Sequence, residues 1–399
     1  MNSSQKQRLI KVAILADFPI SALGGEVSGR GGGQQSTWLP QLAQAFELSE
    51  DLDIHWLILD RSVKKTTIVE KHNQTFHRIP SGPFTVDLAF NYLPARRSLG
   101  KVVRRINPDI VHAWGTETKY PAALMDFGGT KILSMQGIIS EYMRIKSIPN
   151  TWRWRKMAAS ESKFIRAATI ITSESQWGID KVREIVPEAE CRIVEYGVHP
   201  SFYEIEWKPE PTNPYALYIG GGGNRKGLDI LIDAVTTMND RKWELRVAGV
   251  ASEIEQDLLA RIPSVKYLGM LSWDEMRRQL EAAWCSVLPT RADTSPNSVK
   301  EARVVGLPVV TTLNGGQAGY IRDGENGRIV APLTAEGLAL ALSTTMASYE
   351  GVLSMGRTRH HEDRAYLNAS RTATGFSAIY HELGEQFSTP KLSKARCKS

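Results

Sequence analysis

The residues best suited to chemistry lie in two segments of the second half of the chain. In the first segment, an apolar run ends at Leu288 and a loop then presents Asp293. Ser295 opens a good helix start, and Gly306 is a typical helix end. We therefore expect a helix over about 297–305 whose first backbone N–H groups can bind an anion such as a diphosphate. The residues expected at this anion site are Ser295, Asn297 and Ser298.

Charged side chains that suit the rest of a nucleotide flank this anion site. Glu301 lies about one turn inside the expected helix, and its carboxylate can accept hydrogen bonds from two neighbouring hydroxyls, as a ribose offers. The glycine-rich loop 220–227 permits close backbone approach, at Gly222 for example, and ends in Arg225 and Lys226. Two cations aimed at a departing diphosphate stabilise the transition state more than the ground state. Because they can replace a metal ion, we expect no metal and no other cofactor.

Both segments belong to a regular alternation of short apolar runs and amphipathic stretches. Leu228, Leu231, Ile232 and Val235, for example, fall on one helical face. Strands that alternate with helices form a parallel sheet covered on both faces, and ligands bind at the carboxyl ends of its strands. The expected strands are 11–16, 54–59, 110–113, 132–135, 170–172, 192–194, 216–219, 244–248, 265–267, 286–288 and 309–312.

The same pattern of strand, glycine loop and helix starts twice along the 399 residues, a length that fits two domains. Between the two starts, the polar stretch 206–214 holds three prolines and is interpreted as a linker. We expect an N-terminal, acceptor-side Rossmann-like domain over 1–205 and a C-terminal, nucleotide-binding Rossmann-like domain over 206–375. The final segment, 376–399, is expected to end a helix that crosses back to the first domain, followed by a polar tail.

Three motifs together resemble the family 4 (group 1) retaining glycosyltransferases, which have the GT-B fold of two Rossmann-like domains across a cleft. Asp293 and Glu301 have the spacing of the family's E-x7-E signature. The run 225–227, Arg-Lys-Gly, resembles its phosphate loop, and 306–310 reads Gly-Leu-Pro-Val-Val, as after the signature helix. The resemblance covers most of the chain. It implies a hexosyltransferase-type enzyme that moves a sugar from a nucleoside-diphosphate sugar to a hydroxyl acceptor on a glycan, a lipid-linked molecule or a small molecule.

The resemblance also implies a role for each matching residue. Glu301 would hold the ribose, and Asp293 would contact hydroxyls of the donor sugar. Arg225 and Lys226 would bind the diphosphate. Further residues placed near the donor in this way are Gly222, Gly249 and, beside the base, Met270.

The sequence departs from the family pattern at three places. Asp293 replaces a glutamate and reaches about one methylene less far, and the segment 315–319 lacks the family's acidic residue. Gln136 stands where the family often has a histidine near the donor sugar. Glutamine cannot titrate, so it can position a sugar hydroxyl but not act as an acid or base. This fits the family's retaining mechanism, in which a phosphate oxygen takes the acceptor's proton.

The first half holds the expected acceptor side. Glycine clusters follow the first strand, where the family often has a glycine pair near the donor phosphate; a flexible surface loop is the alternative. Glu117 follows the run 109–115, which resembles a family strand, and is expected to face the acceptor. His112, within that run, is expected to be packed rather than catalytic. The glycines assigned here are Gly25 and Gly33 for the donor and Gly32 for the acceptor.

The formal net charge of +6 favours anionic partners. Basic and aromatic residues cluster in the first half, where two interpretations stay open: peripheral contact with anionic lipid headgroups, and a solvated face over packed helices. An anionic acceptor is a further option. No nucleic-acid-binding module is recognisable, so no nucleic-acid partner is expected. The clustered residues are Arg96, Arg97, Lys101, Arg104, Arg105, Arg144, Lys146, Trp152, Arg153, Trp154, Arg155 and Lys156.

The apolar segments and the cysteines indicate the cellular compartment of the protein. No stretch reaches the ~18–20 apolar residues of a membrane span, and the start of the sequence lacks the features of a signal peptide. The three cysteines are far apart and have no metal-ligand spacing. We expect a cytoplasmic protein, peripheral on the inner face of the membrane if it contacts lipid. Two other functions stay open: a GT-B epimerase or hydrolase, and a non-catalytic protein that binds a sugar nucleotide.

Overall fold

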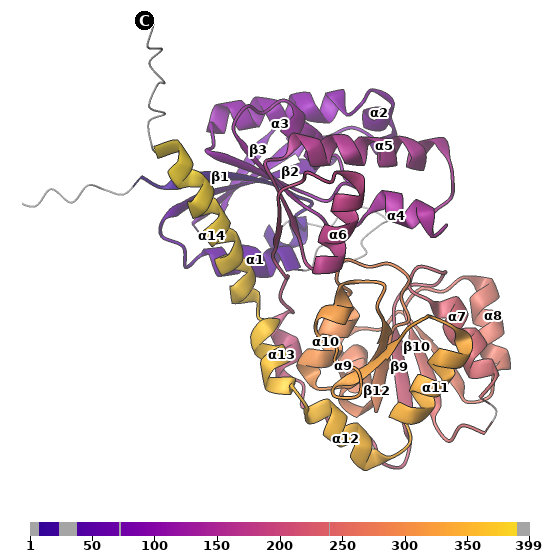
Figure 1. Cartoon of the computed structure of the whole chain (residues 1–399). Helices are drawn as coiled ribbons and strands as arrows, with labels where there is room; N and C mark the ends of the chain where they lie inside the picture. Colours follow the sequence, from indigo (N-terminus) through magenta and orange to yellow (C-terminus); the bar gives the residue numbers. More distant parts are fainter. Residues whose placement is uncertain (1–7, 24–37, 72, 239, 389–399) are drawn as a thin grey trace, which may run out of the picture. The chain divides into compact units, whose positions relative to one another are not determined.

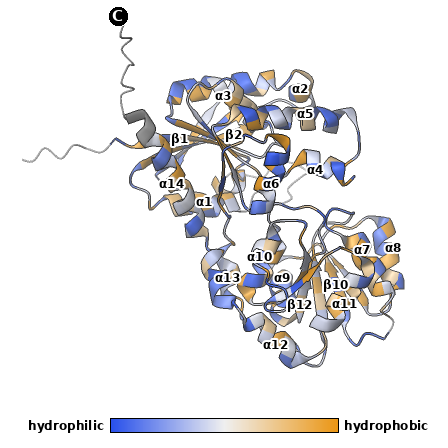
Figure 2. Ribbon diagram, viewed as in Figure 1, coloured by the Kyte–Doolittle hydropathy of each residue, from blue (hydrophilic) through white to orange (hydrophobic). Residues whose placement is uncertain are grey.

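The computed structural model describes residues 8–23, 38–71, 73–238 and 240–388 (Figure 1). The chain divides into two compact units. The first unit consists of residues 1–134, 167–170 and 372–399, and the second of 135–166 and 171–371. Most strands of both sheets are rich in apolar residues, whereas the helices carry both apolar and polar residues (Figure 2), as expected for helices that cover a buried sheet.

An eight-stranded sheet has the order β3-β4-β2-β1-β5-β6-β7-β8. The pairs whose register the structure gives are parallel, except that β3 is antiparallel to β4. Its strands are β1 (Ile10–Leu15), β2 (Leu52–Asp60), β3 (Thr67–Lys71), β4 (Gln74–Pro80), β5 (Ile110–Trp114), β6 (Thr130–Ser134), β7 (Ile170–Ser173) and β8 (Cys191–Ile193). The helices between them are α1 (Trp38–Phe46), α2 (Phe84–Ala89), α3 (Leu93–Ile106), α4 (Ile139–Arg144), α5 (Trp152–Ala167) and α6 (Gln176–Ile185).

A six-stranded parallel sheet has the order β11-β10-β9-β12-β13-β14. Its strands are β9 (Tyr215–Ile219), β10 (Glu244–Ala248), β11 (Val265–Gly269), β12 (Cys285–Val287), β13 (Val309–Thr312) and β14 (Gly327–Val330). The helices that follow its strands are α7 (Leu228–Thr236), α8 (Glu253–Arg261), α9 (Trp273–Ala282), α10 (Asn297–Val305), α11 (Ala335–Thr345), α12 (Tyr349–Arg357), α13 (His360–Tyr366) and α14 (Ala369–Ser388). Short 3-10 helices are η1 (Ile20–Leu23), η2 (Tyr120–Met125), η3 (Pro200–Glu204) and η4 (Gly316–Gly319).

Each strand expected from the sequence is present within two residues of its predicted bounds. The prediction missed β3, β4 and β14. Residues of β3 alternate between half-buried and exposed at the edge of the sheet, so its sequence is too polar to show a buried strand. β14 has only four residues and begins at a glycine. The predicted linker 206–214 forms neither helix nor strand, and its backbone bonds to the end of α9, with the N–H of Lys208 donating to the carbonyl of Glu281 at 2.8 Å.

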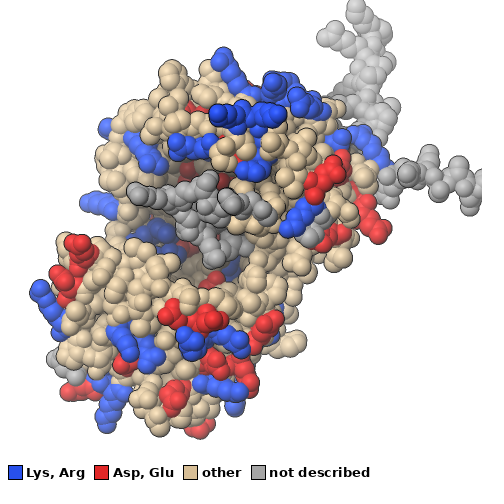
Figure 3. All heavy atoms as spheres, turned by 180° about the vertical axis from the view of Figure 1, so that it is seen from behind, with Lys and Arg blue, Asp and Glu red and all other residues tan. Residues whose placement is uncertain are grey.

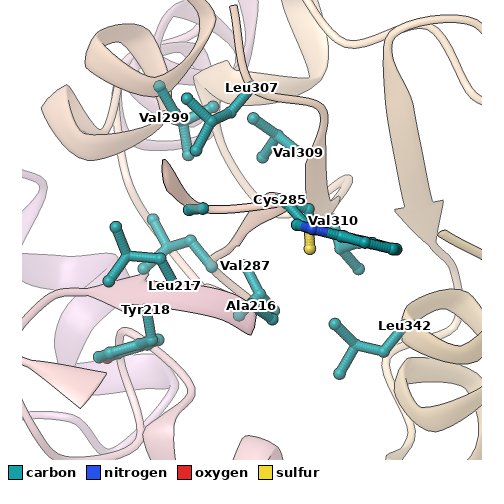
Figure 4. Packing of buried hydrophobic residues seen from close by; sticks show 14 of the residues in the cluster. Ala216, Leu217, Tyr218, Cys285, Val287, Val299, Leu307, Val309, Val310 and Leu342 are labelled. Carbon is teal, nitrogen blue, oxygen red and sulfur yellow. The ribbon is translucent and has the colours of Figure 1, made fainter. Parts of the chain in front are cut away.

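The core of the second unit fixes α10 against the sheet (Figure 4). Val299 of α10 is fully buried in the same cluster as Leu307 and Val309 at the start of β13, and Val287 at the end of β12. Burial of side chains of this size stabilises by about 1.5–3 kcal/mol each. The carboxyl end of β12 and the first turn of α10 are therefore held in place by the same core.

The central pair of this sheet creates the place for a site. β9 and β12 are neighbours in the sheet, with Leu217 opposite Ser286. β10 lies on the other side of β9, and β13 lies on the other side of β12, so the strand order runs in opposite directions from this central pair. At such a reversal of strand order, the loops after the two strands diverge and leave a crevice for ligands. The glycine-rich loop 220–227 follows β9, and the loop 289–296 that contains Asp293 follows β12.

One glycine ties these two loops together. Gly227 has a φ of +78°, and a Cβ at this position would stand 2.0 Å from the carbonyl oxygen of Pro289. Only glycine combines this backbone conformation with so close an approach. The end of the glycine-rich loop is therefore packed directly on the end of β12.

We predict that Gly227→Ala destabilises the protein. A side chain at positive φ costs about 1–2 kcal/mol, and the contact with Pro289 adds to this cost. Gly221→Ala is the matched control, because nothing lies within 4 Å of its Cβ position. Urea denaturation of both variants should show the loss only for Gly227→Ala; equal free energies of unfolding would contradict the packing described here.

Candidate functional site

The predicted charged residues of the second unit meet at the crevice between β9 and β12. Asp293 is buried, and its Oδ2 accepts a hydrogen bond from Arg225 Nη1 at 3.0 Å and another from Lys226 Nζ. Its Oδ1 accepts from the backbone N–H of Ser295 at 3.2 Å. Burial alone would raise the pKa of Asp293, but Lys226 and Arg225 hold it below its ordinary value. The site therefore contains an ionised carboxylate between two cations.

Arg225 is fixed from a second side. Its guanidinium carbon lies 5.0 Å from the centre of the Tyr142 ring, within range of a cation–π interaction. The neighbouring Asn224 donates from its side chain to the carbonyl of Ile145 at 3.0 Å. Sequence reasoning missed Tyr142, because no motif marks it and it is 83 positions from Arg225.

α10 begins at Asn297 and ends at Gly306, as predicted, and the φ of Gly306 is +115°. The expected side-chain cap is wrong, because Pro296 precedes the helix and no described side chain caps it. The Ser295 hydroxyl instead donates to Glu195 Oε1 at 2.8 Å. The first N–H groups of the helix, at Asn297 and Ser298, thus have no capping side chain, which suits an anion site.

Glu301 is half-buried on the first turns of α10. Burial raises the pKa of its carboxyl to about 7, although Lys300 and Lys226 oppose the shift. Within the described residues, its carboxylate makes no hydrogen bond to protein. It is therefore available to accept bonds from hydroxyl groups.

The glycine-rich loop and the ends of β10 and β11 lie along the same edge of the sheet. The N–H of Gly222 donates to the carbonyl of Val250 at 2.6 Å, and the N–H of Gly249 donates to the carbonyl of Gly269 at 2.8 Å. Glu255 of α8 accepts from the N–H of Gly223 at 2.6 Å and so braces the loop. Met270, just after β11, has a 73% exposed side chain.

The remaining predicted residues are placed as follows. Gln136 follows β6, its side chain is half-buried, and its carbonyl accepts from Thr294 Oγ1 at 2.6 Å, next to Asp293 in sequence. Glu117 follows β5 in the first unit and is half-buried. The glycines predicted before α1 lie outside the described residues; they are Gly25, Gly32 and Gly33.

His112 is packed, as expected. It is fully buried, its Nδ1 lies 2.7 Å from the Tyr380 hydroxyl, and its Nε2 lies 2.6 Å from Ser134 Oγ. Burial lowers its pKa well below the ordinary value for histidine. A neutral ring with both nitrogens occupied has a structural role in joining β5, β6 and α14.

The two sheets with their crossover helices have the GT-B fold, as superposition on solved structures shows. The candidate site lies at the strand ends of the second sheet. Sucrose-phosphate synthase from Thermosynechococcus elongatus superposes with a TM-score of 0.75 at 15% identity, over 94% of this chain and 100% of that one. HepE from Anabaena, solved in complex with UDP, superposes with a TM-score of 0.67 at 14% identity, over 94% and 100% of the two chains.

A known family matches the second half of the sequence. Residues 213–348 match the family described as Glycosyl transferases group 1. Glycogen synthase from Mycobacterium tuberculosis is 24% identical over 302 residues, which are 72% of this chain and 73% of that protein. This match lies in the half of the chain that carries the three motifs, and it agrees with the resemblance that they indicated.

Two features of the described residues concern membranes and metals. None of their helices combines the length and the apolar character that crossing a bilayer requires. Nor do they contain a group of three or more His, Cys, Asp or Glu side chains arranged to hold a metal ion.

The raised pKa of Glu301 predicts that the free energy of unfolding depends on pH. The folded protein binds this proton up to about pH 7, but the unfolded chain only up to about pH 4.5. Wild-type protein therefore loses stability as the pH rises through this window, and Glu301→Gln does not. Between pH 5 and pH 8, the variant should gain roughly 1–3 kcal/mol relative to wild type in urea denaturation. A difference in the free energy of unfolding that stays constant between pH 5 and pH 8 would refute this.

Proposed function

We propose that the protein is a retaining glycosyltransferase that moves a sugar from a nucleoside-diphosphate sugar to a hydroxyl acceptor. The observation that carries the proposal is the cluster of Asp293, Arg225 and Lys226 at the strand reversal, beside an uncapped helix N-terminus. Two side-chain cations and one carboxylate leave one net positive charge that can bind a diphosphate. The N-terminus of α10 adds a partial positive charge to it.

Each group has a defined part in the transfer. Arg225 and Lys226 bind the diphosphate and stabilise the charge that develops as the glycosidic bond breaks. Asp293, held against them, accepts hydrogen bonds from the donor sugar through its remaining lone pairs. Glu301 accepts from the ribose hydroxyls. Since side-chain cations neutralise the leaving group, the proposed reaction is metal-independent.

The retaining course is proposed from the family resemblance together with Gln136. This side chain cannot exchange a proton, so the acceptor hydroxyl attacks from the face that the diphosphate leaves, and a phosphate oxygen takes the proton. Gln136 orients a sugar hydroxyl. A hydrolase or epimerase would need an acid–base group that Gln136 does not supply.

A uridine nucleotide and a hexose are the first donor to consider. HepE structures are described in complex with UDP, with UDP and glucose, and with UDP-glucose. The names of the two relatives above, glycogen synthase and sucrose-phosphate synthase, support hexosyl transfer. The buried free thiols of Cys191 and Cys285 agree with a reducing, cytoplasmic location.

A nucleotide screen tests the proposal directly. We expect UDP to raise the melting temperature in the presence of EDTA, and GDP, ADP, CDP and TDP to raise it less. The shift follows from binding to the folded state alone. If no nucleotide shifts the transition, with or without Mg²⁺, the proposed donor site is refuted; a shift only with Mg²⁺ overturns metal independence.

We predict that Arg225→Ala and Lys226→Ala each lower turnover of UDP-glucose at least tenfold, which corresponds to about 1.4 kcal/mol of lost transition-state stabilisation. Lys266→Ala is the control, because Lys266 is an exposed cation on β11 of the same sheet. Release of UDP measures the rate. Rates equal to the control in both variants would remove these cations from the mechanism.

We also propose that α3 contacts anionic lipid headgroups. Leu93, Arg97, Lys101 and Arg104 are exposed and fall on one face of this helix. Phe90, at the end of α2, has a 64% exposed side chain next to the start of that face. Lys and Arg side chains gather at the top of Figure 3. An apolar tip beside several cations suits the surface of an anionic bilayer.

Vesicle sedimentation tests this contact. Wild-type protein should sediment with phosphatidylcholine vesicles that contain phosphatidylglycerol, and not with phosphatidylcholine alone. The triple variant Arg97→Gln, Lys101→Gln, Arg104→Gln should bind at least tenfold more weakly, since each cation near such a surface contributes about 1 kcal/mol. Phe90→Ser should also weaken binding, unlike Leu340→Ser, which removes an equally exposed side chain of α11. Sedimentation unaffected by these changes would favour a merely solvated face.

A further inference from the structure

A buried lysine stands directly before Glu301 on α10. The side chain of Lys300 has no exposed surface, yet its Nζ donates to Glu174 Oε2 at 2.8 Å, to Glu195 Oε1 at 3.1 Å and to the carbonyl of Tyr196 at 3.0 Å. These bonds use all three ammonium protons. Glu174 follows β7, and Glu195 follows β8.

The same network reaches the proposed donor site. Glu195 Oε1 accepts from Ser295 Oγ as well as from Lys300, and the N–H of Ser295 donates to Asp293 Oδ1. The carboxylate of Glu195 therefore binds two parts of this region. Lys300 attaches α10 to it, and Ser295 attaches the loop that contains Asp293. Thr294, between them, donates to the carbonyl of Gln136.

Stability alone does not explain this arrangement. Taking an ammonium and two carboxylates out of water costs several kcal/mol for each ion, and well-packed apolar side chains are often as stable. The neighbours of Lys300 on this helix, Val299 and Ala302, are fully buried and apolar. A methionine or leucine would satisfy the packing, but it would not bond to Glu195.

We propose that Lys300, through Glu195 and Ser295, is a positioning residue that fixes Asp293 and the first turn of α10 for the donor. The inference rests on the proposed function for what the positioned groups bind. It concerns Lys300 and Glu195, to which no motif assigns a role, and Lys300 itself touches no substrate.

The variant that tests it must not leave buried charges unpaired. Lys300→Met alone strands two carboxylates, so we combine it with Glu174→Gln and Glu195→Gln. The neutral triple variant should fold. Its affinity for UDP should fall at least tenfold by calorimetry, and amides of residues 292–299 should exchange with deuterium at least tenfold faster without any ligand.

The matched control lies on the same helix. Arg303 is also fully buried and pairs with Asp363, its Nε donating to Oδ2 at 2.8 Å, but it lies toward the other end of α10. Arg303→Met with Asp363→Asn removes a buried ion pair of the same kind. This variant should lose stability while UDP affinity and the exchange of residues 292–299 stay within twofold of wild type.

Ser295→Ala supplies a second route if the triple variant fails to fold. It breaks the link to Glu195 without moving a charge, and it too should speed exchange of residues 292–299 at least tenfold. Wild-type exchange in either folded variant, or equal effects in the Arg303 control, overturns the inference. If wild-type protein itself does not bind UDP, the proposed donor fails, and the exchange measurement still decides the role of Lys300.

Discussion

The buried carboxylate of Asp293, with Arg225 and Lys226 against it, is the interaction on which the rest of the second unit depends. A lone carboxylate in this position would carry a large desolvation cost, and two unpaired cations would repel each other. Their mutual neutralisation is available only if the loops after β9 and β12 are adjacent. The strand order provides that adjacency, and Gly227 allows the two loops to touch.

The N-terminus of α10 lies beside this charged cluster and extends the candidate site. Its N-terminal end lacks a side-chain cap, so backbone N–H groups remain for a ligand beside the ionised cluster. Its other end is held by contacts with protein: Gly306 ends the helix, Arg303 pairs with Asp363, and the carbonyl of Val304 accepts from His360 and Arg364. One end of the helix is thus fixed by the fold, and the other keeps backbone N–H groups without a capping side chain.

The sequence predicted this part of the structure because its determinants are local. β9 is a continuous apolar run, and the glycine that ends α10 marks its own position. The meeting of Asp293 with Arg225 and Lys226 was predictable only through the family motifs. The edge strand β3 escaped prediction because an exposed edge needs no apolar face.

What could not be predicted is the set of buried contacts between distant positions. Lys300 is 126 positions from Glu174 and 105 from Glu195, and no spacing rule links them. The available signal was local: a charged residue on the buried face of a predicted helix. Such a residue must find a partner or lose its charge, so it indicates a polar network without naming its members.

The charges of this region also follow a simple balance. Three cations, Arg225, Lys226 and Lys300, face three carboxylates, Asp293, Glu195 and Glu174. Burial raises the pKa of Glu174, and the attraction of Lys300, with which it forms an ion pair at 2.8 Å, opposes the shift. Lys300 is thus occupied by Glu174 and Glu195, whereas Arg225 and Lys226 share one carboxylate, that of Asp293. Burial raises the pKa of Glu301 as well, so a fourth carboxylate adds little negative charge below pH 7. A local positive excess therefore remains at Arg225 and Lys226, where the proposed diphosphate would bring negative charge.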